Sequence, residues 1–297
     1  MFRNAYVLLL LTTLFWGGNA VAGKLAVDHI SPMVLNALRW AVAAAIMTAI
    51  GLPQLRRDWP VVRRKLLLLG ALGAGGFSLF NAAMYSALLY TTAINVSIEQ
   101  AGMPMLIFAA NFLLYRMGVA PGQIVGFTMS LVGVALTASH GDLTRLAELD
   151  LNRGDLMMLL GIVIYSGYTV ALRYKPAVHW HSLMLVMCVA AFLSTLPFVA
   201  WEWGTERMIL PDARGWALVA YTAIFPSVLS QVFYIRGVEL IGANRAGLFM
   251  NMVPIYGTLL SVLILGESFH LYHAAAIVLV LGGIWLAEHS GRKRAAS

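Results

Sequence analysis

The chain has 297 residues, of which 60% are hydrophobic and only 11% are charged, and its mean hydropathy is +0.80. A soluble domain is about half apolar and about a quarter charged, so this composition excludes an ordinary soluble protein. The formal net charge is +7, but the placement of the basic residues, described below, accounts for it without a nucleic-acid partner.

Apolar, nearly uncharged stretches recur along the chain, each close to the roughly 20 residues that a helix needs to cross a bilayer core. Continuous apolar runs of this length exclude the alternating strands of a membrane barrel. We therefore expect an all-α polytopic membrane protein that contacts the lipid bilayer and has no separate soluble domain. The predicted ten spans are residues 5–23, 33–52, 66–90, 93–115, 121–139, 154–172, 182–201, 215–235, 243–265 and 270–288.

The second half of the chain repeats part of the first at an offset of 150 residues. In this register Pro104 corresponds to Pro254, and Gly133 corresponds to Gly283. A unit of five spans is odd, so two tandem copies enter the membrane from opposite sides. Inverted repeats of this kind are typical of secondary transporters that alternate access to a central site.

The basic residues are distributed unequally between the two sides of the predicted membrane protein. With a cytoplasmic N-terminus, 14 of the 20 basic residues lie on the inner side, as the positive-inside rule favours. We expect both termini in the cytoplasm and a bacterial-type inner (plasma) membrane. The predicted units are a first five-helix repeat at 1–139, an external connecting loop at 140–153 and a second, inverted repeat at 154–297.

Small residues and prolines mark two further features. Gly122 and Gly126 form a Gly-x-x-x-Gly pattern, which lets helices approach closely. We expect this face to pack within the chain rather than between copies, and we favour a monomer. Pro104 and Pro254 interrupt the fourth and ninth spans at matched positions. Because proline frees a backbone carbonyl and kinks a helix, both are hinge candidates beside a site between the repeats.

Several motifs together resemble the EamA-type drug/metabolite transporter family. The first half carries Phe-Trp-Gly-Gly-Asn at 15–19, Ser-Pro at 31–32 leading to Arg-Trp at 39–40, and Tyr-Thr-Thr-Ala at 90–93 leading to Pro104. The second half carries Gly-Ala at 242–243, Pro254 and Leu-Gly-Glu-Ser at 265–268. One departure is that Arg-Met-Gly at 116–118 stands where the second half has Gly-Glu-Ser, so the acid at 267 has no counterpart in the first half.

The resemblance covers the whole chain in two units. It implies ten helices, export of small organic molecules across the inner membrane, and no ATP site. Within the family, the chain looks closest to exporters of aromatic amino acids.

Glu99 is the acidic residue that falls well inside a predicted span. An ionisable side chain in hydrocarbon costs at least ~2.5 kcal/mol on insertion scales, so it usually faces a cavity or a partner. Asn95 and Met103 lie four residues to either side and would share its helical face. Two roles remain open for Glu99: proton exchange that couples export to a proton gradient, and a structural hydrogen bond.

Arg39 lies about two turns into the second span. It is either a charge partner of Glu99 or a group that attracts a substrate carboxylate, because the planar guanidinium matches both carboxylate oxygens. We favour the pairing with Glu99.

Amides and aromatic residues on shared helix faces complete the candidate cavity. Buried amides in a membrane protein either tie helices together or line a wet cavity, and tyrosine and tryptophan combine an apolar body with a polar tip. The candidates are Trp16, Asn19, Asn81, Tyr85, Gln231, Tyr234 and Asn251.

No catalytic, nucleotide-binding or metal-ligating motif occurs in the sequence, so we expect no enzyme activity and no cofactor. The prediction is a secondary, non-ATP exporter of small amphipathic metabolites, with aromatic and other apolar amino acids first. An organophosphate or nucleotide-sugar carrier, or a multidrug exporter of the same fold, is the alternative. An intramembrane enzyme or a lipid-handling scaffold is the alternative from another class.

Overall fold

The computed structural model describes residues 4–115, 121–142, 152–241 and 249–295, and these residues form helices and connecting turns without any strand. The prediction of an all-α chain is therefore confirmed over this part of the sequence. Ten helical stretches of the described residues overlap the ten predicted spans.

The first half contains five helical stretches, two of which are built from shorter segments. A π-helical segment, η2, interrupts the third stretch, and a break at 101–102 divides the fourth. The elements are α1 (Ala5–Leu25), α2 (Pro32–Val62), η1 (Arg63–Lys65), α3 (Leu66–Leu72), η2 (Gly73–Leu79), α4 (Phe80–Ala87), α5 (Ala93–Gln100), α6 (Met103–Tyr115) and α7 (Pro121–Ala138).

The second half follows the same plan. Its π-helical segment η4 lies 150 residues after η2 and has the same length, so the repeat extends to an uncommon backbone conformation. The elements are α9 (Arg153–Ala171), η3 (Leu172–Tyr174), α10 (Trp180–Gly204), α11 (Ala213–Thr222), η4 (Ala223–Leu229), α12 (Ser230–Ile241), η5 (Phe249–Asn251), α14 (Met252–Leu260), η6 (Ser261–Leu265) and α15 (Leu271–Ala295).

Length and apolar composition qualify seven helices of the described residues as membrane spans. One of them, Pro32–Ala87, is a continuous helical run that contains the second and third predicted spans. Two further apolar helices, Phe249–Leu265 and Leu271–Ala287, are shorter. The predicted second span was too short, since α2 continues to Val62 through two prolines.

Helix ends follow local signals in the sequence. The Asn4 side chain accepts a hydrogen bond from the backbone N–H of Tyr6, and the Asn152 and Asp212 side chains cap α9 and α11 in the same way. Gly266 ends η6 in the left-handed conformation, with a φ of 67°, which glycine adopts at little cost.

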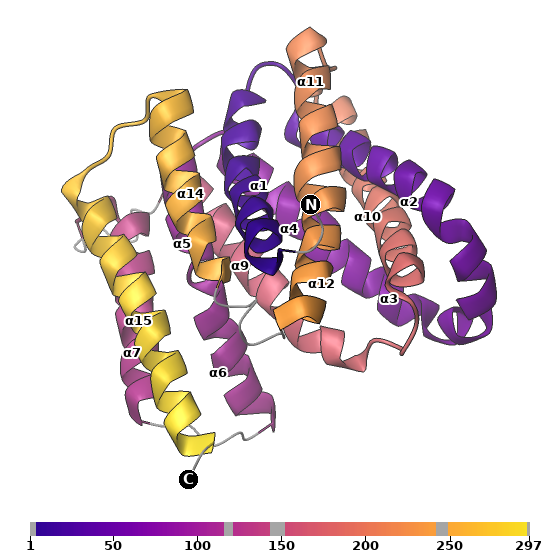
Figure 1. The fold of residues 1–297 in the computed structure, drawn as a ribbon. Coiled ribbons are helices and arrows are strands. Elements are labelled where there is room, and N and C mark those ends of the chain that lie inside the picture. The colour runs from indigo at the N-terminus through magenta and orange to yellow at the C-terminus, as the bar shows by residue number, and fades with distance from the viewer. Residues whose placement is uncertain (1–3, 116–120, 143–151, 242–248, 296–297) are drawn as a thin grey trace.

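Helices that correspond in the two halves of the chain make corresponding contacts. The corresponding helices α2 and α10 lie side by side at one edge of the bundle, and α7 and α15 lie side by side at the other (Figure 1). Helix α1 packs on α12 and α14, and the equivalent helix α9 packs on α4 and α6. This arrangement is that of two similar units related by a two-fold axis.

The bundle has two ends, which are named here by one residue each. At the His29 end, α1 leads into α2, α4 leads into α5, and α10 leads into α11. The His29 ring at this end lies 2.7 Å from the Asp212 carboxylate. The opposite, Asn4 end carries the start of α1 and the end of α12.

Glycines bring α7 and α15 into close contact. A Cβ on Gly126 would overlap the carbonyl oxygen of Gly283, and a Cβ on Gly122 would overlap the Ser290 hydroxyl. Ser130 also donates a 3.2 Å hydrogen bond to the carbonyl of Val280. The Gly-x-x-x-Gly face therefore packs within the chain, as predicted.

Gly126→Ala is expected to destabilise the protein by about 1–3 kcal/mol, because the added methyl forces apart two backbones that are in contact. Gly70→Ala is the matched control, since a Cβ there meets nothing within 4 Å. The midpoint of thermal unfolding in detergent measures the effect, and equal midpoints for the two variants would contradict the proposed role of this contact.

Candidate functional site

A cavity of about 670 Å³ lies between the two halves of the bundle. Positions that correspond in the repeat line it from both sides: Asn81 with Gln231, and Met103 with Val253. Its wall is largely aromatic and apolar, which is typical of small-molecule sites. The lining residues are Trp16, Asn19, Arg39, Trp40, Gly76, Phe77, Phe80, Asn81, Gln100, Ala101, Met103, Ile107, Tyr165, Tyr168, Thr169, Leu172, Pro226, Gln231, Tyr234, Met250, Asn251, Val253, Pro254 and Ile284.

Arg39 is the charged side chain among the described residues that line this cavity, and it is 3% exposed. Its Nη1 donates to Asn81 Oδ1 at 2.7 Å, to Asn19 Oδ1 at 3.0 Å and to the Tyr85 hydroxyl. Its Nε donates to Ser227 Oγ at 2.6 Å. The guanidinium carbon lies 4.9 Å from the ring centroid of Trp40, within cation–π range.

The partners of Arg39 are all neutral. No described carboxylate lies within ion-pair distance of it, so the favoured pairing of Arg39 with Glu99 is wrong. The reason is geometric, since Arg39 faces η4 and α4 whereas Glu99 faces α9 and its acid Asp155. Its Nη2 donates to no described side chain. The cavity therefore contains a cation whose charge no described carboxylate neutralises.

Most of the predicted cavity residues lie on this cavity: Trp16, Asn19, Asn81, Met103, Gln231, Tyr234, Asn251 and Pro254, in addition to Arg39. The Trp16 Nε1–H donates to the carbonyl of Pro226 at 3.0 Å, and its ring lies 5.6 Å from that of Tyr234. These two contacts join α1 to η4 and α12 across the two halves. Whether these residues bind a substrate remains a prediction.

Three candidates lie elsewhere. Tyr85 is 2% exposed, and its hydroxyl donates to Asn19 Oδ1 at 2.9 Å, so it supports the cavity without lining it. Asn95 and Glu99 are fully buried nearer the His29 end. They do not share a face with Met103, because the helix breaks after Gln100 and a new helix begins at Met103.

The two hinge candidates occupy equivalent helices. Pro254 is buried on α14 and lines the cavity. Pro104 lies in the first turn of α6, and its side chain is outside the described part of the structure. The α-helix begins one residue before Pro104, after the break at 101–102, and two residues before Pro254, directly after the 3₁₀ segment η5.

Two tyrosines of α9 form an aromatic wall of the cavity that was not predicted from the sequence. Tyr165 and Tyr168 line the cavity, with their ring centroids 5.3 Å apart, and Tyr168 also lies against Phe77. A signal was present, because at an offset of 149 residues Tyr165 corresponds to Trp16 and Tyr168 corresponds to Asn19.

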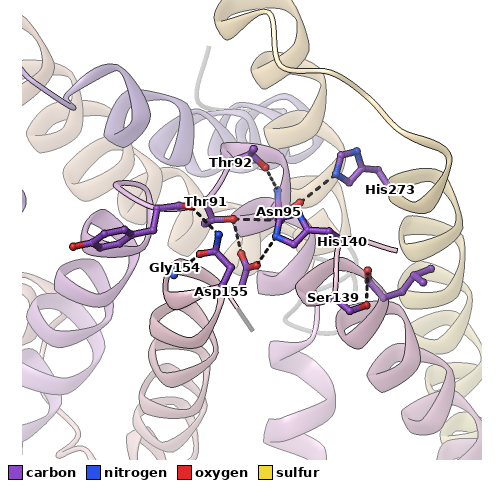
Figure 2. A network of polar contacts seen from close by, with 11 residues as sticks. Thr91, Thr92, Asn95, Ser139, His140, Gly154, Asp155 and His273 are labelled. Atoms are coloured by element: carbon purple, nitrogen blue, oxygen red, sulfur yellow. Dashed lines mark hydrogen bonds and ion pairs between the residues drawn. The ribbon is translucent and has the colours of Figure 1, made fainter. Parts of the chain in front are cut away.

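Behind the cavity, a polar network fills the His29 end (Figure 2). The Thr91 hydroxyl donates to Asp155 Oδ1, and the His140 Nε2 lies 3.2 Å from Asp155 Oδ2. The Asn95 amide oxygen lies 3.2 Å from the Nε2 of His273. The Thr91 and Asn95 contacts join the first half of the chain to the second, the His140 contact joins the connecting loop to the second half, and none of these residues lines the cavity.

Carboxylates from the second half also cap helices of the first half at this end. Glu267 accepts backbone hydrogen bonds from Ala93 at 2.8 Å and Ile94 at 2.9 Å, at the N-terminus of α5. Glu202 accepts from the Ser31 hydroxyl at 2.6 Å and the Met33 N–H at 3.1 Å, at the N-terminus of α2. Negative charge at a helix N-terminus is stabilising, so these contacts stabilise the packing of the two halves at the His29 end.

The outermost contact at the His29 end involves Asp212. Hydrogen bonds from the backbone N–H of Gly215 and from the His29 ring hold the pKa of Asp212 below its usual range. His29 and Asp212 come from opposite halves, so this exposed pair adds to the contacts between them.

Comparison with known proteins decides the family. The model of the EamA-like transporter family matches residues 3–139 and again residues 152–288. The chain belongs to the EamA-like transporter family. The resemblance seen in the sequence is thereby confirmed, and so is the fold of ten membrane helices in two repeats. This EamA-like chain is a multi-pass membrane transporter and not an enzyme.

The similar proteins are named as transporters, and the matches extend over most of the length of each. The uncharacterized transporter YetK of Bacillus subtilis is 25% identical, over 95% of this chain and 86% of the relative, and YyaM of the same organism is 26% identical, over 96% and 93%. The aromatic amino acid exporter YddG of Ancylobacter novellus is 25% identical, over 99% of this chain and 100% of the relative. A solved crystal structure that is 23% identical has the same fold, with a TM-score of 0.65 over 97% of this chain and 98% of the other.

Arg39→Lys is expected to lower stability by about 2 kcal/mol, because an ammonium cannot replace both the Nε bond to Ser227 and the Nη1 bonds to the amides. Arg236→Lys is the control, since Arg236 pairs with Glu239 on the surface. The change in thermal midpoint in detergent is the measurement; a loss no larger than that of the control would show that the Arg39 contacts contribute little.

Proposed function

We propose that this transporter is a secondary exporter of small amphipathic metabolites, foremost aromatic and other apolar amino acids, that works by alternating access. The observation that carries the proposal is an aromatic cavity in which Arg39 is the one cation among the described lining residues, and its described partners are all neutral. A substrate carboxylate supplies the missing counter-charge, and the aromatic wall stacks on its side chain.

Amides support the same substrate class. Asn19 and Asn81 are already held by Arg39, whereas Gln231 and Asn251 line the cavity from the second half. Such neutral polar groups orient an amino-acid head and allow its release. The relative named as an aromatic amino acid exporter adds support from outside the structure.

The chemistry of the cavity also ranks the alternatives. An organophosphate or nucleotide-sugar carrier needs several cations to hold two or more negative charges, and the described lining provides Arg39 alone. A multidrug exporter of the same fold does not need a buried cation in its cavity. Both alternatives are therefore ranked below amino-acid export.

The proposed transport cycle uses the two ends of the bundle in turn. The lining residues Thr169, Leu172 and Tyr234 lie in the halves of the helical runs Arg153–Tyr174 and Ala213–Ile241 that point to the Asn4 end. The His29 end is closed by contacts between the halves. We assign the Asn4 end to the cytoplasm of a bacterial-type inner membrane, with both termini inside. Pro104 and Pro254 are the hinge candidates for the exchange.

Cysteine labelling tests this orientation. Leu210→Cys, at the 69% exposed Leu210 of the His29 end, is expected to react with a membrane-impermeant maleimide in intact cells. Arg57→Cys, on the exposed end of α2, is expected to react only after permeabilisation. The native Cys188 is buried and serves as the background control. Labelling of position 57 in intact cells would reverse the proposed orientation.

Trp16→Ala is expected to reduce phenylalanine transport about fivefold more than alanine transport, because one aromatic contact is worth about 1 kcal/mol. Trp285→Ala is the matched control, since Trp285 is 64% exposed on α15 and does not line the cavity. Counterflow of each radiolabelled amino acid into proteoliposomes gives the two rates. Equal losses for both solutes would contradict the aromatic site, and no flux of either through the unmodified protein would contradict amino-acid transport itself.

A further inference from the structure

Glu99 stands apart from every other acid that the structure describes. It lies on α5, is 0% exposed, and neither of its carboxylate oxygens has a hydrogen-bond partner among the described residues. Burying an ionised carboxylate without a donor or a counter-charge costs many times the energy of burying the neutral acid. Glu99 therefore carries a proton in this conformation.

The neighbouring acid Asp155 explains why the proton resides on Glu99. Asp155 acts electrostatically on Glu99 from the first turn of α9. Unlike Glu99, it has a hydrogen-bond donor, because the Thr91 hydroxyl donates to its Oδ1, and the His140 Nε2 lies 3.2 Å from its Oδ2. Two neighbouring carboxyls in a low-dielectric site do not both ionise readily, so the charge goes to Asp155 and the proton to Glu99.

The groups around this pair come from every element packed on α5. Helix α1 brings Lys24, whose Nζ donates to the carbonyls of Leu88 and Thr91, and α14 packs through Gly257 against Ser97. The turn after α7 brings His140 and, two residues on, Asp142. The segment before α15 and its first turns bring Glu267, His270, Tyr272 and His273.

These surrounding groups already have partners in the closed state. Glu267 is engaged at the N-terminus of α5. The Nδ1 of His273 accepts the backbone N–H of His270, so its Nε2–H donates to Asn95 and the ring is neutral. His140, with a side chain 31% exposed, connects the pair to water.

We propose that Glu99 is a proton-binding site that makes opening of the His29 end depend on the pH at that end, protonated while the His29 end is closed and deprotonated when that end opens. Opening parts Thr91 from Asp155 and Asn95 from His273, because each pair spans the two halves (Figure 2). Water then reaches Glu99, takes its proton as hydronium and solvates the carboxylate that remains. Closing requires a proton to return from water on the same side. The inference rests on the proposed alternation between the two ends.

The closed state binds one proton more than the open state, so raising the pH favours opening. For a single proton, the ratio of open to closed molecules rises by up to about tenfold for each pH unit over the range where the two states differ in protonation. Spin labels at Leu89→Cys and Leu271→Cys, in a Cys188→Ala background, report this ratio as a distance distribution. Both positions are exposed at the His29 end, and they belong to opposite halves.

Distance measurements from about pH 5 to about pH 9 on the full chain in nanodiscs test the proposal without any transported solute. A longer distance is expected to gain population as the pH rises in the unmodified protein. Glu99→Gln, which mimics the protonated acid, is expected to remain in the short-distance state throughout. Glu239→Gln is the control: it removes an exposed acid that pairs with Arg236, and it is expected to follow the unmodified protein.

A pH-independent distribution in the unmodified protein, or a Glu99→Gln variant that responds like it, would overturn the proposal. Glu99→Asp keeps a titratable carboxyl in a different position and is expected to move the midpoint of the pH response. An unchanged midpoint in that variant would count against the proposal even if Glu99→Gln failed to fold. Because no solute is present, these results are independent of the phenylalanine and alanine fluxes that test the proposed function.

Discussion

The buried charge of Arg39 is the constraint on which the centre of this protein depends. A guanidinium remains charged at any relevant pH, so the surrounding helices must supply oxygens to it. They do so from α1 through Asn19, from α4 through Asn81 and from η4 through Ser227. These three helices meet α2 at one point, and the cavity lies beside that point. The same interaction that joins the two halves therefore leaves a positively charged group facing the cavity.

The π-helical segments η2 and η4 belong to this arrangement. They occupy equivalent positions in the repeat, and Ser227, which binds Arg39, lies within η4. Asn81 and Gln231 each lie two residues after the end of a π-helical segment. A π-helical turn shifts the residues that follow it relative to an ideal α-helix. The shift directs an amide from each half toward the cavity, so the backbone irregularity serves the site.

The two-fold relation between the halves does not extend to the polar contacts that close the His29 end. Glu267 caps α5, whereas the corresponding position in the first half is Met117. Asp155 lies in the first turn of α9, whereas the corresponding position in α1 is Tyr6. The sequences of the two copies have diverged in the residues that hold one end closed while keeping the prolines and amides near the centre. Because the closing contacts are charge-assisted and join the halves, they are the contacts that an opening motion must break.

Particular residues show where sequence reasoning was sufficient and where it failed. The amides and aromatic residues that recur at the repeat offset, such as Asn81 and Gln231, do lie on one cavity. Helical spacing placed Glu99 and Met103 on one face, which is wrong because the helix breaks at 101–102 and spacing rules apply only within an unbroken helix. Opposite charge suggested a pairing of Glu99 with Arg39, but one sequence cannot show which helices are neighbours.

The sequence by itself determined the all-helical class, the ten apolar stretches, the internal repeat and the family, because hydrophobic length and periodicity are local properties that survive without any contact being known. Only the tertiary structure decided the partners of each buried polar group. Arg39 binds neutral oxygens, Asp155 accepts a hydrogen bond from Thr91 and lies beside His140, and Glu99 has no donor among the described residues. These differences arise from the packing of helices distant in sequence, and in a low-dielectric interior the presence or absence of one donor decides whether an acid is charged or holds a proton.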